Sequence, residues 1–260
     1  MPTEPFLLIL LGSLGLAIGF VGGLLGLVLG VLRYPLILTT AGAGESVAVV
    51  AGTNIGISTL GAMTAAIRHF RQNNVHLGIF AIMALTGAAG AFLGSMLTRQ
   101  VPANLIFLII GGIVSFEAYS LITGSRSKAR TGQKPPGKPS LRVELLIGFG
   151  VGLLGGMVGL VLGSIRMPAM ISILKMEPRV AIGTNLAASS IMGAAGLAGH
   201  LLNGEVDLLV LGVMGSTAMV GGYVGARYTG RFSANTLKLL IGIVLVFVAG
   251  VMFVRAAVSL

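Results

Sequence analysis

The sequence predicts an all-α, polytopic membrane protein made of two inverted-topology repeats. Composition is the first observation behind this prediction: 55% of the 260 residues are hydrophobic, 9% are charged, and the mean hydropathy is +1.00. A soluble domain carries about 25% charged residues, so this chain has too little polar surface to dissolve in water. Apolar stretches of about 20 residues, long enough to cross a bilayer, fill nearly all of the chain. The alternating pattern of outer-membrane barrel strands is absent.

The second observation is a ten-residue phrase that occurs twice. Residues 26–35 read Gly-Leu-Val-Leu-Gly-Val-Leu-Arg-Tyr-Pro, and residues 159–168, 133 positions later, read Gly-Leu-Val-Leu-Gly-Ser-Ile-Arg-Met-Pro. The match continues at an offset of 131 through these pairs: Thr53-Asn54 with Thr184-Asn185, Ser58 with Ser189, His69 with His200, Gly90 with Gly221, and Gly111 with Gly242. We therefore predict an internal duplication across the whole chain.

The first repeat is expected over residues 1–123. It opens on an apolar block, residues 6–41, that is too long for one helix and short for two full spans. We predict a break between Gly30 and Pro35, because glycine is conformationally permissive and proline removes a backbone donor. The block is then a broken or re-entrant pair of helices. Three further spans are expected, at about residues 46–67, 77–97 and 104–122.

Residues 124–141 are polar, basic and rich in Pro and Gly, which is typical of a solvated linker. The second repeat, residues 142–260, opens on an apolar block over residues 145–174. Its further spans are expected at about residues 180–201, 208–228 and 236–254. Closely spaced glycines within the apolar blocks predict helix packing faces, as in the series Gly12, Gly15, Gly19, Gly22, Gly23 and Gly26.

The third observation is where the basic residues lie. If each opening block goes out and back, thirteen Lys and Arg residues share the side of the linker, and only Arg99 and Arg255 fall opposite. The positive-inside rule then predicts a cytoplasmic linker and both termini outside the cell (inner) membrane. Each repeat also crosses the bilayer an odd number of times. The second repeat is therefore upside down relative to the first, as in many secondary transporters.

The two repeated arginines, Arg33 and Arg166, are the main candidate substrate-binding residues. An arginine at the bilayer centre costs about 3 kcal/mol or more, so its presence there suggests a function. We expect the two side chains to converge from opposite directions and to bind a compact oxyanion through their guanidinium groups. Helix N-termini near Pro35 and Pro168 would add positive dipole ends. The alternative is that each arginine caps carbonyls at a helix break or reaches the headgroups.

Further candidates lie on both sides of each arginine along the chain. Gly30 and Gly163 are expected to hold the broken backbone of the site. Thr53, Asn54 and Ser58, with their partners Thr184, Asn185 and Ser189, fall on one helical face and are expected to bind the anion or to bridge helices. His69 and His200 lie at span ends, where either proton coupling or interfacial hydrogen bonding is open to them. Tyr34 and Met167 are expected to pack.

Other functions have little support. The chain has no cysteine, no Ser-His-Asp set and no His-rich metal motif, so no cofactor, metal or enzymatic activity is predicted. The net charge of +10 is explained by the positive-inside bias rather than by nucleic acid. The expected partners are a small anionic substrate and the lipid bilayer, and a homodimer is left open.

The chain resembles the sulfite exporter TauE/SafE family of membrane permeases. The resemblance rests on Gly19-Phe-Val-Gly-Gly-Leu-Leu-Gly26 with Gly30 and Pro35, on Gly152-Leu-Leu-Gly-Gly-Met-Val-Gly159 with Gly163 and Pro168, and on the stretch His200 to Asp207. It implies transport of sulfite, sulfonates and related sulfur anions, often outward. It also implies that the Gly-to-Pro phrases and Thr-containing turns line the substrate path. The family usually has Gly-Thr-Ser where this chain has Gly-Thr-Asn.

We therefore predict a secondary transporter, an exporter by this resemblance, for sulfite or organosulfonates. Alternating access would operate at the interface between the repeats. A passive anion channel, a transporter for another small carboxylate or oxyanion, and a non-transporting membrane partner remain as alternatives.

Overall fold

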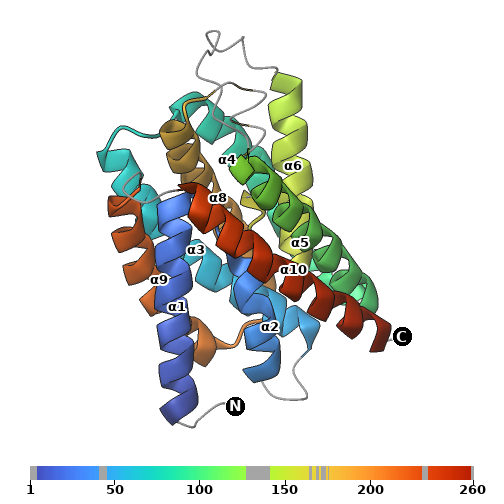
Figure 1. The fold of residues 1–260 in the computed structure, drawn as a ribbon. Helices are drawn as coiled ribbons and strands as arrows, with labels where there is room; N and C mark the ends of the chain where they lie inside the picture. Colours follow the sequence, from blue (N-terminus) through green and yellow to red (C-terminus); the bar gives the residue numbers. More distant parts are fainter. Residues whose placement is uncertain are drawn as a thin grey trace.

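The computed structural model describes residues 5–40, 46–126, 141–163, 166, 167, 170, 174, 176–229 and 234–258, and these residues are almost entirely helical (Figure 1). The predicted spans are confirmed to within a few residues at most ends. The elements are α1 (Pro5–Leu25), α2 (Gly30–Thr40), α3 (Val47–Arg71), α4 (Leu77–Leu97), a 3-10 turn (Thr98–Gln100), α5 (Ala103–Arg126), α6 (Leu141–Val158), α8 (Pro178–Leu202), α9 (Leu208–Arg227) and α10 (Ala234–Val258).

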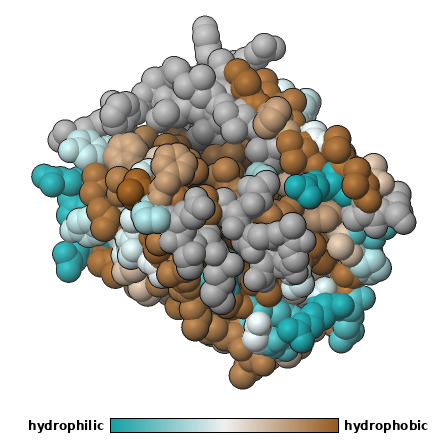
Figure 2. All heavy atoms as spheres, turned by 90° about the horizontal axis from the view of Figure 1, so that it is seen from below, coloured by the Kyte–Doolittle hydropathy of each residue, from teal (hydrophilic) through white to brown (hydrophobic). Residues whose placement is uncertain are grey.

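The exterior of this helix assembly is apolar. Among the described residues, six helices are long and apolar enough to cross a membrane, and two shorter apolar helices accompany them. Large apolar side chains are exposed on several helices, including Phe6, Leu146 and Phe247 at 74–75%. Among the residues that Figure 2 colours by hydropathy, hydrophobic ones are the more common, with hydrophilic residues in scattered patches. An apolar outer surface over spanning helices is that of a polytopic membrane protein, as predicted.

The break in the first block lies earlier than the sequence suggested. Helix α1 ends at Leu25, and Gly26 adopts a left-handed backbone with φ of 69°. The amide of Leu27 donates to the carbonyl of Gly22 at 3.0 Å, which closes the helix in a Schellman-type turn. Helix α2 then begins at Gly30, so Pro35 lies inside that helix and not near its N-terminus.

The same turn closes the corresponding helix of the second half. Helix α6 ends before Gly159, whose φ is 71°, and the amide of Leu160 donates to Gly155 at 2.8 Å. The left-handed conformation at both glycines explains why the chain turns at the first residue of each repeated phrase. Pro168 lies outside the described residues.

Helix α2 does not span the membrane. Its 11 residues are about 16 Å long, roughly half the thickness of the hydrocarbon core. Gly56 and Gly61 of α3 lie against Leu211 and Ala218 of α9, in the same order along both helices. Helix α1 also runs parallel to α9, with Gly19 against Ala218 and Gly23 against Gly222. The chain therefore returns between α1 and α3, so the first block is an out-and-back excursion.

The two halves pack against each other reciprocally. Glycine faces let α1 approach α9 and let α6 approach α4, and α1 and α9 lie side by side in Figure 1. This confirms the predicted packing role of the closely spaced glycines. Helices α3 and α8 pack together, as do α5 and α10.

Equivalent helices run antiparallel. Along the α3–α8 contact, Gly56 lies against Leu197 and Gly193 lies against Thr59. Along the α5–α10 contact, Gly111 lies against Phe253, while Gly242 lies against Ile122. The residue numbers rise along one helix as they fall along the other, in both pairs of repeat-equivalent helices.

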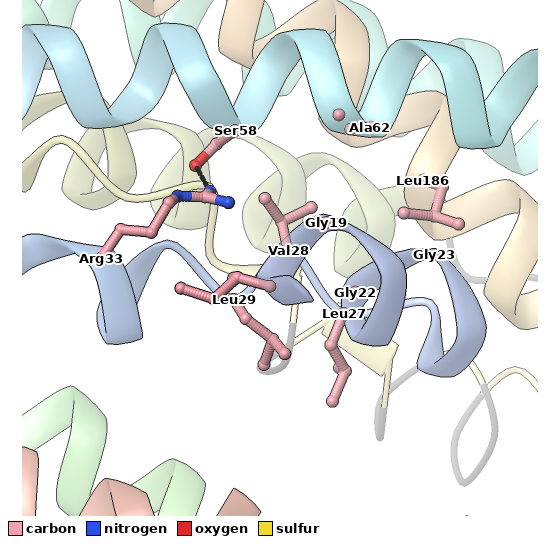
Figure 3. A pocket seen from close by; sticks show the side chains of 12 residues that line it. Gly19, Gly22, Gly23, Leu27, Val28, Leu29, Arg33, Ser58, Ala62 and Leu186 are labelled. Atoms are coloured by element: carbon pink, nitrogen blue, oxygen red, sulfur yellow. Dashed lines mark hydrogen bonds between the residues drawn. The ribbon is translucent and has the colours of Figure 1, made fainter. Parts of the chain in front are cut away.

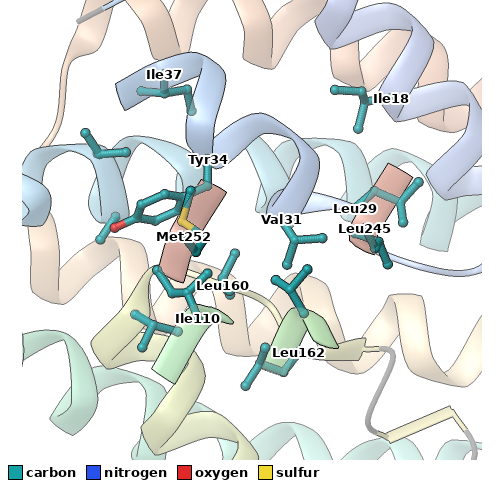
Figure 4. Packing of buried hydrophobic residues seen from close by; sticks show 14 of the residues in the cluster. Ile18, Leu29, Val31, Tyr34, Ile37, Ile110, Leu160, Leu162, Leu245 and Met252 are labelled. Atoms are coloured by element: carbon teal, nitrogen blue, oxygen red, sulfur yellow. The ribbon is translucent and has the colours of Figure 1, made fainter. Parts of the chain in front are cut away.

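A buried apolar cluster joins both halves near α2 (Figure 4). Tyr34 is fully buried in it beside Met252, and its hydroxyl donates to the carbonyl of Val47 at 3.3 Å. Met167, at the matching position of the second phrase, belongs to the same cluster. The predicted packing role of Tyr34 and Met167 is confirmed.

Candidate functional site

Arg33 is buried between α2 and α3, with 2% of its surface exposed. Its Nε donates to Asn54 Oδ1 at 3.4 Å, and its second terminal nitrogen donates to Ser58 Oγ at 2.6 Å. Figure 3 shows the guanidinium reaching from α2 to Ser58. Asn54 and Ser58 are four residues apart on α3 and share one helical face, as the spacing predicted, and this face meets the guanidinium.

Arg166 has the same arrangement in the second half. It is fully buried; its Nε donates to Asn185 Oδ1 at 3.2 Å and its second terminal nitrogen donates to Ser189 Oγ at 2.6 Å. The duplicated sequence therefore builds a duplicated hydrogen-bond set of arginine, asparagine and serine.

The asparagines connect each set to the opposite half. Asn54 Nδ2 donates to the carbonyl of Gly159 at 2.9 Å, and Asn185 Nδ2 donates to the carbonyl of Gly26 at 2.9 Å. Asn185 also donates to its own half, at the carbonyl of Gly163. The side-chain oxygen of each asparagine thus accepts a hydrogen bond from an arginine. The side-chain nitrogen of the same asparagine donates a hydrogen bond to the helix-ending turn of the other repeat.

Within the described part of the chain, neither arginine has a carboxylate partner. The ion pairs found there are Arg99 with Glu205 and His200 with Glu205, both outside the arginine sets. Neutral amide and hydroxyl oxygens satisfy some of the guanidinium donors but do not cancel the positive charge. A buried cation without a counter-ion is costly, and a bound anion would offset that cost.

A small cavity lies beside Arg33. Its lining includes Arg33 and Ser58 together with Gly22, Leu27, Leu29 and Gly61. The cavity volume is about 20 Å³, which is room for about one water molecule. A second cavity, lined among others by Gly155, Leu160, Leu162 and Met192, occupies the equivalent place in the other half and measures about 10 Å³.

The two arginines belong to different sets. Arg33 bonds to α3 and Arg166 bonds to α8, and Arg166 is not among the described residues that line the cavity beside Arg33. Each guanidinium is therefore held by its own repeat, and the asparagine amides connect each set to the helix-ending turn of the other repeat.

Gly30 and Gly163 lie directly against these sets. A Cβ at Gly30 would stand 2.9 Å from Ser58 Oγ and 3.0 Å from Asn54 Nδ2, and one at Gly163 would stand 2.7 Å from Asn185 Nδ2. Only glycine permits this approach, so both residues position the asparagines. Pro35 is half-buried within α2.

The threonines face the opposite half instead of the arginines. Thr53 Oγ1 accepts from the amide of Asp207 at 2.8 Å, and Thr184 Oγ1 accepts from the amide of His76 at 2.9 Å. Asp207 and His76 are the N-caps of α9 and α4. Each threonine therefore holds the start of a helix in the other repeat, an interhelical bridge of the kind anticipated for these residues.

The two histidines differ. His200 Nδ1 lies 2.7 Å from Glu205 Oε2, and its Nε2 lies 3.0 Å from the carbonyl oxygen of Gly156. Glu205 also pairs with Arg99 Nε at 2.6 Å. His69 is fully buried, and neither of its ring nitrogens has a hydrogen-bond partner among the described residues. Hydrogen bonding at a span end is confirmed for His200, and proton coupling by either histidine stays a prediction.

Sequence reasoning missed Glu205 and Arg99. Glu205 follows His200 by five residues in the same turn, a local signal that could have paired them. Arg99 lies in the 3-10 turn that follows α4 in the other half, and nothing in its local sequence indicates the contact with Glu205.

Long apolar helices with an apolar exterior define a polytopic membrane protein. The comparisons with known proteins agree with this class. The family model described as "Sulfite exporter TauE/SafE" matches residues 11–252, and the chain belongs to this family of membrane transporters. The resemblance drawn from the glycine phrases is confirmed.

The relatives are proteins named as membrane transporters. "Probable membrane transporter protein YunE" of Bacillus subtilis (strain 168) is 24% identical over 259 residues, covering 92% of this chain and 95% of YunE. A "Probable membrane transporter protein" of Xylella fastidiosa (strain 9a5c) is 25% identical over 260 residues, covering 99% of both chains. No solved structure matches the chain.

Proposed function

We propose that this family member is a secondary transporter of small sulfur-containing oxyanions, such as sulfite or organosulfonates, and that it works as an exporter. The observation that carries the proposal is the pair of buried arginines, held by neutral asparagine and serine oxygens and without a carboxylate partner in the described chain. The family description supplies the substrate class.

Arg33 has hydrogen-bond donors that could bind an anion in addition to its side-chain partners. A guanidinium carries five N–H donors. In Arg33, Asn54 and Ser58 accept from two of these donors, one on Nε and one on a terminal nitrogen. Sulfite and sulfonate oxygens match the fork of a guanidinium and can accept two parallel hydrogen bonds. An anion in the cavity beside Arg33 would lower the cost of the buried charge. The cavity is smaller than such an anion, so substrate entry requires the site to open.

The packing of the halves supports alternating access. Equivalent helices α3 and α8 run antiparallel, and so do α5 and α10. If these helices cross the bilayer, the second repeat is inverted relative to the first, with the linker over residues 124–141 in the cytoplasm and both termini outside. Inverted repeats exchange their conformations, and a site between them is exposed to one side and then to the other.

Transport of sulfite into proteoliposomes tests the proposal. The purified full-length chain should drive saturable uptake of radiolabelled sulfite, and an excess of organosulfonate should compete. The double variant Arg33→Gln/Arg166→Gln should lose this uptake while remaining monodisperse, with Arg142→Gln on the exposed start of α6 as the matched control. Uptake that the double variant retains would refute the arginine site. Unsaturable ion conductance would identify the alternative, a passive channel.

A further inference from the structure

The surroundings of the two arginine sets differ at a position beside the guanidinium group. Gly61 on α3 corresponds to Met192 on α8 at the offset of 131. The Met192 sulfur contacts the first terminal nitrogen of Arg166, whereas Gly61 has no side chain and lines the cavity beside Arg33. The methionine therefore occupies the side of Arg166 that is left open at Arg33.

A second substitution compensates for the first. Met192 packs on Gly87 of α4, where a Cβ would collide with its sulfur and methyl group. The residue equivalent to Gly87 is Ala218 of α9, and a Cβ at Gly61 would meet the Ala218 Cβ at 3.6 Å. The second half thus pairs Met192 with Gly87, a large residue with a glycine. The first half pairs Gly61 with Ala218, a glycine with a larger residue. The matched change keeps a close helix contact in both halves, while the space beside the arginine differs.

The cavities reflect this difference. The one of about 20 Å³ is lined by Arg33 and Ser58. The one of about 10 Å³ is lined by Met192, and neither Arg166 nor Ser189 is among its described lining residues. An anion entering the second cavity would reach apolar surface and a thioether, which has no hydrogen-bond donor and no positive charge to offer it.

Resting on the proposed function, we propose that the Arg33 set alone binds the anion and that each chain takes up one anion. Arg166, covered by Met192, is a positioning residue: it holds Asn185, which in turn holds the turn at Gly26 beside the Arg33 cavity. Gly61 and Met192 thereby decide which of two duplicated sites is open. The site takes a single compact oxyanion.

The experiment exchanges the two arrangements in the full-length protein. Gly61→Met/Ala218→Gly copies the covered arrangement onto the Arg33 set, and Met192→Gly/Gly87→Ala copies the open arrangement onto the Arg166 set. Sulfite binding is measured by isothermal titration in detergent, with Met192→Leu as a control that keeps bulk without sulfur. The first exchange should weaken sulfite binding about 10- to 100-fold, as loss of a charged hydrogen bond does. The second should keep the original site and raise the stoichiometry from one toward two, and Met192→Leu should bind one anion as the wild type does.

Several results would overturn the inference while leaving the proposed function intact. One is wild-type sulfite affinity in a folded Gly61→Met/Ala218→Gly variant. Another is a stoichiometry of two in the wild type. A third is equal loss of binding in Arg33→Gln and Arg166→Lys, since lysine keeps the charge of Arg166 and an ammonium group that can donate to Asn185. Failure of the wild type both to bind sulfite and to transport it would instead remove the proposed function, and this inference with it.

Discussion

The side-chain amide of Asn54 donates a 2.9 Å hydrogen bond to the carbonyl oxygen of Gly159, 105 residues further along the chain. Gly159 ends α6 in a left-handed turn, so its carbonyl has no helical partner of its own to accept from. Asn54 also accepts from Arg33. One amide therefore links a buried cation in one repeat to a helix end in the other, and any movement of one repeat against the other must change this contact.

Replacing Asn54 by Ala should destabilise the protein by about 1–3 kcal/mol, because Arg33 and the Gly159 carbonyl both lose a buried partner. Asn185→Ala should cost at least as much, since it removes the equivalent contacts and a further bond to the Gly163 carbonyl. Thermal unfolding in detergent measures the effect. Asn74→Ala, which removes an exposed contact to Gln72, is the control and should change the melting temperature little. An equal shift for all three variants would contradict the linking role.

Ser58→Ala and Ser189→Ala should each lower the stability of the unliganded protein by about 1–3 kcal/mol, because each leaves a guanidinium donor without its acceptor. The two variants should then respond differently to sulfite. An anion beside Arg33 can replace the lost acceptor, so sulfite should restore the melting temperature of Ser58→Ala. Ser189→Ala should recover only by the amount the wild type gains. Identical rescue of both variants would argue for two equivalent binding sites.

Thr53→Val should destabilise the protein by about 1 kcal/mol, because the amide of Asp207 at the start of α9 loses its acceptor. Thr184→Val should do the same to the amide of His76 at the start of α4. Serine keeps a hydroxyl, so Thr53→Ser should recover most of the loss in a thermal unfolding measurement. The affinity for sulfite should change little in any of these variants, because neither threonine hydroxyl touches an arginine. A loss of affinity without a loss of stability would place the threonines in the anion site after all.

The sequence was sufficient to predict what repeats along the chain. The helical membrane class follows from composition and the shared helical face of Asn54 and Ser58 follows from spacing, and the structure confirms both. The duplicated arginine suggested two equivalent groups meeting at one point. The hydrogen bonds join each arginine to the helix that follows it in its own repeat, and a meeting of the two guanidinium groups at one point stays a prediction.

What could not be predicted depends on contacts between the repeats. The Thr53–Asp207 bond joins residues 154 apart, and no local pattern marks either partner. The contact of the Met192 sulfur with Arg166 depends on the position of one apolar side chain, and the sequence does not distinguish this side chain from the many others. The helix end at Gly26 was missed for another reason: glycines are so frequent in this block that the sequence does not single out the one with a left-handed backbone.

Gly159→Ala should prevent or severely weaken folding, and Gly204 provides a matched control. Both glycines have positive φ, 71° and 67°, so a Cβ costs about 1–2 kcal/mol at either position. Nothing lies within 4 Å of a Cβ at Gly204, whereas one at Gly159 would run into the backbone of Ala51 on α3. Overpacking adds about 1–3 kcal/mol or more, and here the obstacle is main chain that cannot rotate away. The melting temperature should therefore fall far more for Gly159→Ala than for Gly204→Ala. Equal falls would mean that only the backbone conformation matters at this turn, and that the close contact between the repeats adjusts at little cost.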